Sequence, residues 1–249
     1  MAGYTSLGSL VPPTRKLFQQ DAYSVTCQAE IIALLGEYVV LNQTVFYGES
    51  GGQDCDLGSI DGVRVVDVQH RQGRLHSVNS PSMGGSTVAI DTVLIHRVED
   101  IASFHIGQSV KAEIDWDRRY KHMRNHSTSH VVFHVCGEVV SEALGQPLYV
   151  EGCHITEDGF RFDFGNEISG ELKEIIEKRA NELLLAETEV RMVPDNSVND
   201  VFYWSALDIV IPCGGTHVRS FSELGQIKLK RSKRSRTVTR IEFKSARDC

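Results

Sequence analysis

Short runs of alternating apolar and polar residues dominate the first half of the chain, and clusters of Gly, Asn and Ser separate them. Period-two alternation sends successive side chains to opposite faces of a strand, so each run predicts a half-buried strand. Short strands at this spacing over about residues 14–113 predict a small barrel or sandwich. The loop 79–86 is expected to be an exposed tip. The predicted strands include residues 38–41, 63–68, 87–90 and 110–114.

The pattern changes to helical spacing at Asp115, and this spacing continues to about Leu144. Asp115 or Asp117 can cap the start of such a helix, and Gly145 and Pro147 are suited to end it. Residues three and four apart lie on the same face of a helix. One face of the predicted helix therefore collects Met123, His126, Ser127, His130, Val131 and His134.

The remainder of the chain alternates strand-like and helical segments. Strands are expected at 149–150, 160–164 and 188–193, and a β-hairpin at 225–231 and 237–243. A second helix over about 169–185 has a predicted apolar side made of Leu172, Ile175, Ile176, Ala180 and Leu183. The elements together predict an α+β fold. We expect an N-terminal glycine-rich, β-barrel-like domain over residues 1–114, followed over 115–249 by an α/β-sandwich-type domain with an antiparallel sheet.

Charge is distributed unevenly along the chain. The 249 residues carry a formal net charge of −7, but residues 226–249 carry +7 and residues 1–225 carry −14. A basic stripe on an acidic chain favours contact with one phosphate backbone over general binding of polyanions. A solvated hairpin face explains the same residues equally well. The candidate contacts are Lys228, Lys230, Arg231, Lys233, Arg234 and Arg236.

Composition excludes several classes of protein. No apolar run reaches the roughly 18 residues that a membrane-spanning helix needs, and the first residues lack the pattern of a signal peptide. The six cysteines have neither the density nor the spacing of a secreted disulfide scaffold. We therefore expect an intracellular, cytoplasmic protein with no membrane contact, and the sequence predicts no protein partner.

Two pairs of residues have the spacing of metal ligands. His126 and His130 lie four apart on the predicted helix, and Cys213 and His217 lie four apart around two glycines that favour a compact loop. Three imidazoles and one thiolate form a donor set that suits zinc. Either pair alone occurs more often without a metal. Together they make a zinc site as good an explanation as ordinary polar side chains.

Two neighbours on the helix limit the chemistry of this site. Zinc proteases of the HExxH type have a glutamate directly after the first histidine, as general base. Here that position is Ser127, so the protease reading is excluded. His134, one turn further along the helix, can be a ligand, support a ligand or belong to the core. We favour the core position.

A third feature is the glycine-rich stretch from Thr44 to Gln53. Glycines at 48, 51 and 52 permit backbone conformations closed to other residues and leave amide N–H groups free to approach a ligand. The side chain of Gln53 can donate and accept hydrogen bonds at once. A plain glycine turn between two strands accounts for the same residues, and this stretch alone favours that simpler reading.

Three separated stretches, taken in order, resemble the alanyl-tRNA editing family, which comprises the AlaX proteins and the editing domain of alanyl-tRNA synthetase. The stretches are the Phe-Tyr-Gly-Glu-Ser-Gly-Gly-Gln run that ends at Gln53, the Met-Arg-Asn-His-x-x-x-His run that ends at His130 and the Cys-Gly-Gly-Thr-His run that ends at His217. The resemblance covers nearly the whole chain, and it is to the medium-sized, free-standing form, which acts in trans.

The resemblance implies a zinc-dependent deacylase that hydrolyses the ester of wrongly charged tRNA for alanine, chiefly seryl and also glycyl esters. It places His126, His130, Cys213 and His217 on the ligands of one zinc ion per chain. It also places Thr44, Gly51, Gly52 and Gln53 where the N-terminal domain closes over the amino-acid pocket. No catalytic residue is implied beyond the zinc site.

Selectivity is expected to depend on one hydroxyl group. An apolar pocket rejects an added hydroxyl poorly, so an editing site for serine needs a polar partner that alanine would leave unpaired. Thr44 is the predicted partner of that hydroxyl. Two alternatives remain from the sequence: a zinc-stabilised RNA-binding module without activity, and a deacylase for another mischarged amino acid or another small ester.

Overall fold

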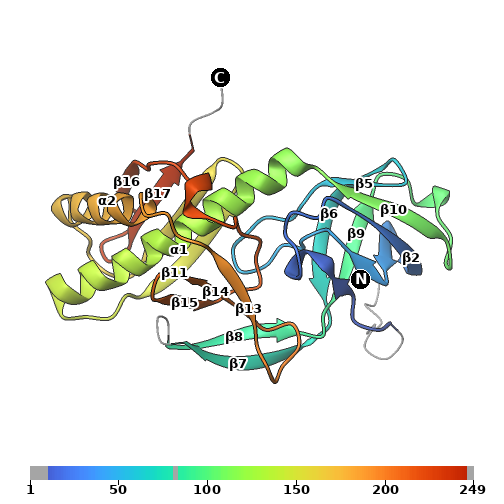
Figure 1. The fold of residues 1–249 in the computed structure, drawn as a ribbon, viewed down its shortest axis with the longest axis horizontal. Helices are drawn as coiled ribbons and strands as arrows, with labels where there is room; N and C mark the ends of the chain where they lie inside the picture. Colours follow the sequence, from blue (N-terminus) through green and yellow to red (C-terminus); the bar gives the residue numbers. More distant parts are fainter. Residues whose placement is uncertain (1–10, 81–83, 246–249) are drawn as a thin grey trace.

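A closed six-stranded barrel forms the N-terminal half of this computed structural model, which describes residues 11–80 and 84–245 (Figure 1). All strand pairs in the barrel are antiparallel, in the order β10, β2, β3, β9, β6, β5 and back to β10. Alternate residues point into the barrel, which is why its sequence has a period of two. The strands are β2 (Thr26–Leu35), β3 (Tyr38–Leu41), β5 (Gly58–Ile60), β6 (Val63–Arg71), β9 (Val93–Val98) and β10 (Ser109–Ile114).

Short elements connect the barrel strands and the later parts of the chain. A parallel pair is formed by β1 (Arg15–Lys16) and β4 (Gln43–Thr44). Single 3₁₀ turns cover Leu17–Gln19, Ile101–Ser103 and Phe221–Glu223. The 3₁₀ turn at Phe221 begins with a capping box, in which the side chains of Ser220 and Glu223 each bond to the backbone of the other residue.

A two-stranded arm leaves the barrel and reaches the C-terminal half of the molecule (Figure 1). It consists of β7 (Arg74–Ser80) and β8 (Gly84–Ile90). Val78 and Ile90 of the arm pack in one buried cluster with Val201, and the hydroxyl of Ser80 bonds to the carbonyl oxygen of Val210. Most of the predicted loop 79–86 therefore belongs to these strands, and Ser80 is buried rather than part of an exposed tip. Residues 81–83 lie outside the described residues.

Helix α1 (Trp116–Leu144) is the longest element and extends from the barrel across the C-terminal half (Figure 1). The side chain of Asp115 accepts a hydrogen bond from the N–H of Arg118, and Gly145 ends the helix with a φ of 62° in the left-handed region. Both ends match the helix predicted from the sequence. Neither α1 nor the second helix, among the described residues, is long and apolar enough to cross a membrane.

The C-terminal half contains two antiparallel sheets and a second helix. One sheet has the strand order β11-β12-β17-β16, and the other has the order β13-β14-β15. The second helix, α2 (Gly170–Leu184), contacts α1. The strands are β11 (Val150–Thr156), β12 (Gly159–Phe164), β13 (Arg191–Pro194), β14 (Phe202–Ala206), β15 (Ile209–Pro212), β16 (Leu229–Lys233) and β17 (Thr239–Lys244).

The core of this half forms where α1 and α2 pack on the inner face of the four-stranded sheet. Val135 of α1, Phe162 of β12, Ile176 of α2 and Ile241 of β17 belong to one buried cluster. Burying one such side chain contributes about 1.5–3 kcal/mol. The predicted apolar side of α2 was wrong at Ile175, which is 41% exposed because the helix turns that side chain away from the sheet.

The predicted and observed folds agree in class. Over the residues that the structure describes, it is mostly antiparallel sheet with a six-stranded barrel and two α-helices. The expected hairpin is formed by β16 and β17, although its first strand begins at Leu229 rather than at residue 225. The barrel ends at Ile114, but the arm β7–β8 contacts the C-terminal half, so the division into domains 1–114 and 115–249 stays a prediction.

Candidate metal centre and cavity

Four side chains from distant parts of the sequence converge at one buried point. His126, His130, Cys213 and His217 each offer one ligand atom, and these atoms all lie within 4.8 Å of one another. The Sγ atom of Cys213 lies 3.6 Å from Nε2 of His126 and 3.2 Å from Nε2 of His217. Both predicted pairs are therefore brought together in one cluster.

Local structure explains how the two pairs meet. His126 and His130 occupy successive turns of one face of α1, with ring centroids 4.7 Å apart. The loop after β15 carries the other pair and folds back tightly, so that the N–H of Gly215 donates to Sγ of Cys213 at 3.3 Å. A Cβ atom at residue 215 would lie 2.3 Å from Cε1 of His126. Only glycine therefore lets this loop lie against the helix.

Hydrogen bonds fix the orientation of two of the imidazoles. Nδ1 of His126 lies 2.7 Å from Oε1 of Gln53, an atom that only accepts, so Nδ1 carries the proton and Nε2 faces Cys213. Nδ1 of His217 lies 3.0 Å from the hydroxyl of Ser127. Metal-binding histidines usually donate their second N–H in this way, which sets the tautomer and the ring orientation.

The protonation states suit a metal site. Burial lowers the pKa of His126 to about 3 and holds the pKa values of His130 and His217 well below the usual range, so all three rings are neutral at pH 7. Burial raises the pKa of the Cys213 thiol to about 12. A bound cation would release that proton, because the thiolate is the form that binds metal.

The cluster also fits zinc in its dimensions. With Zn–N bonds of about 2.0–2.1 Å and Zn–S bonds of about 2.3 Å, tetrahedral ligand atoms lie roughly 3.3–3.6 Å apart. The separation of 3.6 Å between Cys213 and His126 falls in this range, the 3.2 Å between Cys213 and His217 is slightly shorter, and all four ligand atoms lie within 4.8 Å of one another. Nε2 of His130 is buried and has no hydrogen-bond partner among the described residues, as expected of a lone pair available for a cation.

Gln53 comes from the barrel half and braces the cluster. It is fully buried, and its Oε1 accepts from the backbone N–H of Thr216 at 3.2 Å in addition to His126. Its Nε2 donates to the hydroxyl of Thr216 at 3.0 Å. One side chain therefore joins α1, which carries His126 and His130, to the loop that carries Cys213 and His217.

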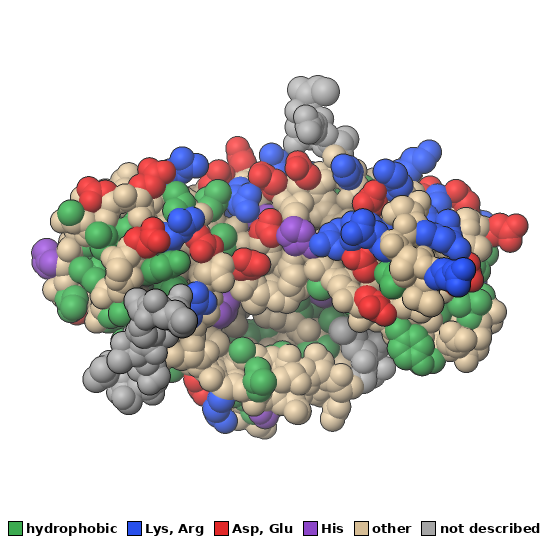
Figure 2. All heavy atoms as spheres, turned by 180° about the vertical axis from the view of Figure 1, so that it is seen from behind, with side chains coloured by type: hydrophobic (Ala, Val, Ile, Leu, Met, Phe, Trp, Pro, Cys, Tyr) green, Lys and Arg blue, Asp and Glu red, His purple; other side chains and the backbone are tan. Residues whose placement is uncertain are grey.

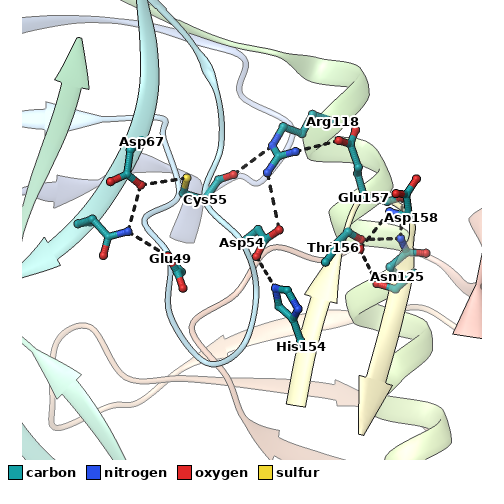
Figure 3. A network of polar contacts seen from close by, with 12 residues as sticks. Glu49, Asp54, Cys55, Asp67, Arg118, Asn125, His154, Thr156, Glu157 and Asp158 are labelled. Carbon is teal, nitrogen blue, oxygen red and sulfur yellow. Dashed lines mark hydrogen bonds and ion pairs between the residues drawn. The ribbon is translucent and has the colours of Figure 1, made fainter. Parts of the chain in front are cut away.

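A polar network holds the loop that carries Gln53 (Figure 3). Asp54 contacts His154 of β11 at 2.7 Å, and Arg118 of α1 donates to the carbonyl oxygen of Cys55 at 3.2 Å. Arg118 also forms an ion pair of 3.0 Å with Glu157, in the turn between β11 and β12. Figure 3 shows these side chains pointing toward one another between the loop, the helix and the sheet.

A buried ion pair anchors the same loop to the start of α1. Arg119 is 0% exposed and Asp56 is 1% exposed, and Nε of Arg119 lies 3.0 and 3.1 Å from the two carboxylate oxygens. The remaining N–H groups of Arg119 donate to the carbonyl oxygens of Ala22 and Val45. The guanidinium is therefore satisfied inside the protein, as a buried charge requires.

A cavity of about 500 Å³ opens beside the ligand cluster. His126, His130 and Cys213 form part of its wall, and apolar side chains that include Phe133 and Phe162 form another part. Strand β8 of the arm forms a further side of the cavity. Figure 2 shows a hollow with hydrophobic side chains on its walls, above the lobe formed by the arm. A small molecule in this cavity lies next to the metal-binding residues and is partly shielded from water.

The residues predicted to contact a substrate lie in different places. Gly51 lines the cavity, whereas Gly52 lies against Cys153 behind it, with a φ of 85°. Gln53 makes its contacts with the ligand cluster rather than with the cavity. Thr44 is buried in the barrel half, where its hydroxyl lies 3.0 Å from Nε2 of His96 and accepts from the N–H of Phe46. Substrate contacts by Thr44 and Gln53 stay predictions, which this arrangement does not support.

His134 does not belong to the core. Its side chain is 26% exposed, and its Nε2 lies 3.3 Å from a carboxylate oxygen of Glu138, one turn along α1. It is also outside the cluster of four ligand atoms. The favoured core position was therefore wrong, because the outward face of α1 carries this residue.

Several cations of the predicted RNA contact form ion pairs or hydrogen bonds within the protein. Lys230 pairs with Glu242 at 3.4 Å, and Lys233 pairs with Glu167 at 2.8 Å. Arg231 donates to the carbonyl oxygen of Ile168. Lys228 instead lines a separate polar groove, and Arg234 and Arg236 are exposed.

Sequence reasoning missed some residues of the site. Ser127 was placed on the same face of the helix as His126, but its contact with Nδ1 of His217 was not predicted. Thr216 sits inside the metal-binding loop, but nothing local indicates that it bonds to Gln53. Trp204, whose ring is tilted against that of His130 with centroids 5.0 Å apart, gives no signal in the sequence.

Two family models match separate parts of this chain. The family described as tRNA synthetases class II (A) matches residues 15–118, and the threonyl and alanyl tRNA synthetase second additional domain matches residues 197–242. The alanine–tRNA ligases of Methanococcus vannielii and Pyrococcus abyssi are 31% and 30% identical to the chain over 94% of its length. The chain spans about a quarter, 26%, of the length of these ligases.

A smaller relative matches from end to end. The alanyl-tRNA editing protein AlaX-M of Pyrococcus horikoshii is 33% identical over 238 residues, which cover 94% of this chain and 99% of the relative. The match includes the barrel, α1 and the loop that carries Cys213, so it extends over all the parts that build the ligand cluster. The chain therefore belongs to the family of the alanyl-tRNA editing protein AlaX-M.

Proposed function

We propose that this protein is a zinc-dependent deacylase that hydrolyses the ester of tRNA for alanine wrongly charged with serine, and secondarily with glycine. Its partner would be the mischarged tRNA in the cytoplasm. The observation that carries the proposal is the cluster of four ligand atoms within 4.8 Å beside a cavity of about 500 Å³. Membership in the editing family supports the choice of an aminoacyl-tRNA as substrate.

His126, His130, Cys213 and His217 would hold one zinc ion per chain. When bound, the ion supplies Lewis acidity that can polarise an ester carbonyl or activate water. Four protein ligands fill a tetrahedral shell, so these residues could equally use the ion to organise the cavity wall. In either case Gln53 holds the imidazole of His126 in place, and Ser127 contacts that of His217.

The cavity residues would position the ester and limit access of water. An aminoacyl ester is already activated, so catalysis needs mainly orientation and stabilisation of the developing oxyanion. Phe133 and Phe162 offer apolar surface for the terminal nucleoside, while Ser50 and Ser129 are hydroxyl groups on the same lining. The hydroxyl of Ser129 already donates to the carbonyl oxygen of His126, so its oxygen would accept from the hydroxyl of a seryl ester, a bond that alanine cannot form.

Release of amino acids from charged tRNA tests the proposal. We expect the purified, zinc-loaded protein to release serine from tRNA for alanine much faster than alanine, and glycine at an intermediate rate. Threonine on its own tRNA serves as the comparison for a different specificity. Changing both Cys213 and His217 to Ala should remove the zinc, about one ion per chain, and the activity with it.

Each alternative gives a different result in this assay. A zinc-loaded protein that binds tRNA and releases no amino acid would be a binding module. Faster release of threonine or alanine than of serine would indicate a deacylase of other specificity. Metal content unaffected by the double change would refute the ligand set.

A further inference from the structure

Four cations of the C-terminal half lie around a groove on the opposite side of α1 from the ligand cluster. This groove, of about 630 Å³, is lined by Lys121 and Arg124 of α1 on one side and by Lys228 and Lys244 on the other. Lys121, Lys228 and Lys244 are exposed, and Arg124 is half-buried. Ion pairs within the described residues involve none of these four, in contrast to Lys230 and Lys233 on the nearby hairpin.

The acidic residues of the groove do not cancel this charge. Glu157 and Asp158 also line it, and Glu157 is paired with Arg118 at 3.0 Å. Four cations against two carboxylates, one of them already paired, leave the groove net positive. A cation that has no protein partner is free to neutralise a phosphate, and the counterions that the RNA backbone then releases favour binding.

The groove is close enough to the ligand cluster for one RNA end to occupy both. Arg124 and His126 are two residues apart on α1, and they project from opposite faces of a helix about 10–12 Å across. The path around half the circumference of such a helix is roughly 16–19 Å, which about five nucleotides at about 3.4 Å each would cover. Residues of the four-stranded sheet line both the groove and the cavity. A small hollow shares Asp158, Phe243 and Lys244 with the groove and includes His154, whose neighbour Cys153 lines the cavity.

We propose that this groove, formed by Lys121, Arg124, Lys228 and Lys244, binds the backbone phosphates of the tRNA end next to the aminoacylated nucleotide. The inference rests on the proposed function for its substrate and revises the position of the RNA contact predicted from the sequence. Hairpin cations such as Lys230 and Lys233 then serve mainly the protein's own carboxylates. Phosphate contacts fix position and affinity without reading sequence, so the groove sets KM rather than the choice of tRNA.

Two variants that remove equal charge test the proposal in the full, zinc-loaded chain. Lys121→Gln/Arg124→Gln removes two groove cations, and Lys230→Gln/Lys233→Gln removes two paired hairpin cations. For seryl-tRNA we expect the groove variant to raise KM on the order of tenfold at physiological salt with kcat unchanged. The slope of log KM against log salt should fall by about two, one for each lost phosphate contact. The hairpin variant should change KM by less than about twofold, as for weak surface charges.

Further measurements separate the groove from the rest of the site. Seryl-adenosine, which has no phosphate, should be hydrolysed equally by both variants and by the wild type, and zinc content should be unchanged. Lys228→Gln/Lys244→Gln, on the opposite wall, should reproduce the effect of the first variant. Equal losses in the groove and hairpin variants, or a larger loss in the hairpin variant, would overturn the proposal.

The groove remains testable if the proposed function fails. If the wild type releases no serine, binding of uncharged tRNA, measured by fluorescence anisotropy, replaces KM as the readout. A groove variant that binds tRNA as tightly as the wild type would then contradict the groove while leaving the question of activity open. Weaker binding by that variant alone would support it.

Discussion

The bond between Gln53 and His126 allows the sharpest test of how the metal centre is built. Replacing Gln53 with Met keeps the length of a fully buried side chain and removes both its acceptor and its donor. The N–H groups of His126 and Thr216 that Oε1 accepts at 2.7 and 3.2 Å then lose their partner. Gln53→Glu is the matched control, because a carboxylate can still accept from both.

The expected loss follows from these contacts. Removing the partner of a metal-binding histidine typically costs 10–100-fold in metal affinity. At about 1.4 kcal/mol per tenfold, this corresponds to roughly 1.4–2.8 kcal/mol. In the metal-free protein, each N–H left buried without a partner lowers the free energy of unfolding by about 1–3 kcal/mol. Gln53→Glu should stay within about threefold of the wild-type metal affinity, since it keeps the acceptor.

Competition with a chromogenic chelator measures zinc affinity, and deacylation of seryl-tRNA at buffered zinc measures the consequence. We expect Gln53→Met to lose activity in parallel with zinc occupancy and to recover it when zinc is in excess. The reasoning is refuted if Gln53→Met binds zinc as tightly as the wild type while KM for seryl-tRNA rises. That outcome would make Gln53 a contact of the substrate, as the sequence alone predicts.

Three further predictions concern the support of this site. Arg119→Met leaves a buried carboxylate without its cation, and urea unfolding should show a loss of about 3–5 kcal/mol; a loss below about 1 kcal/mol would contradict the role of this ion pair. Burial lowers the pKa of His96 to about 4 in the folded protein, whereas the pKa of the same side chain in the unfolded chain is about 6.5. As the pH falls, the unfolded chain therefore binds the proton first. The contribution of His96 to the free energy of unfolding is then complete above about pH 6.5 and falls by up to about 1.4 kcal/mol per pH unit toward pH 4. Urea unfolding at several pH values should show a shallower fall in the free energy of unfolding for His96→Gln than for the wild type, and an equal fall would refute this. Gly215→Ala places a Cβ against His126 and should reduce zinc content, whereas Gly214→Ala, which meets no atom closer than 3.9 Å, should not; equal zinc in both variants would contradict the tight loop.

The sequence predicts the local parts of this structure well. Helix α1 begins after Asp115 and ends at Gly145 as expected, because capping and a left-handed C-terminal residue depend on neighbours a few positions away. The barrel strands follow from their period of two. The four side chains predicted as ligands do lie together in one cluster, since spacing on a helix and a glycine loop limits which donors can meet, and the family resemblance joins the two pairs.

The sequence does not predict contacts between residues that lie far apart in the chain. Gln53 and His126 are 73 residues apart, and Thr44 and His96 are 52 apart, so neither bond has a local signature. From the sequence, Gln53 beside a glycine turn resembles a substrate contact, whereas in the structure it bonds to His126 and Thr216. Likewise, the count of cations in the hairpin overstates its free charge, because Glu167 lies on a separate segment of the chain.

The arm β7–β8 makes one wall of the cavity depend on a marginal element. A ribbon of two strands has little stability of its own in water, and within the described residues this one pairs with no third strand. Its position rests on the packing of Val78 and Ile90 against Val201. The free energy of local opening at this wall is therefore smaller than that of the barrel, and amide hydrogens of the arm should exchange first. A ligand that fills the cavity and touches the arm would shift this local equilibrium toward the closed arm. Binding in the cavity would then slow hydrogen exchange in the arm, which is far from the ligand cluster in sequence.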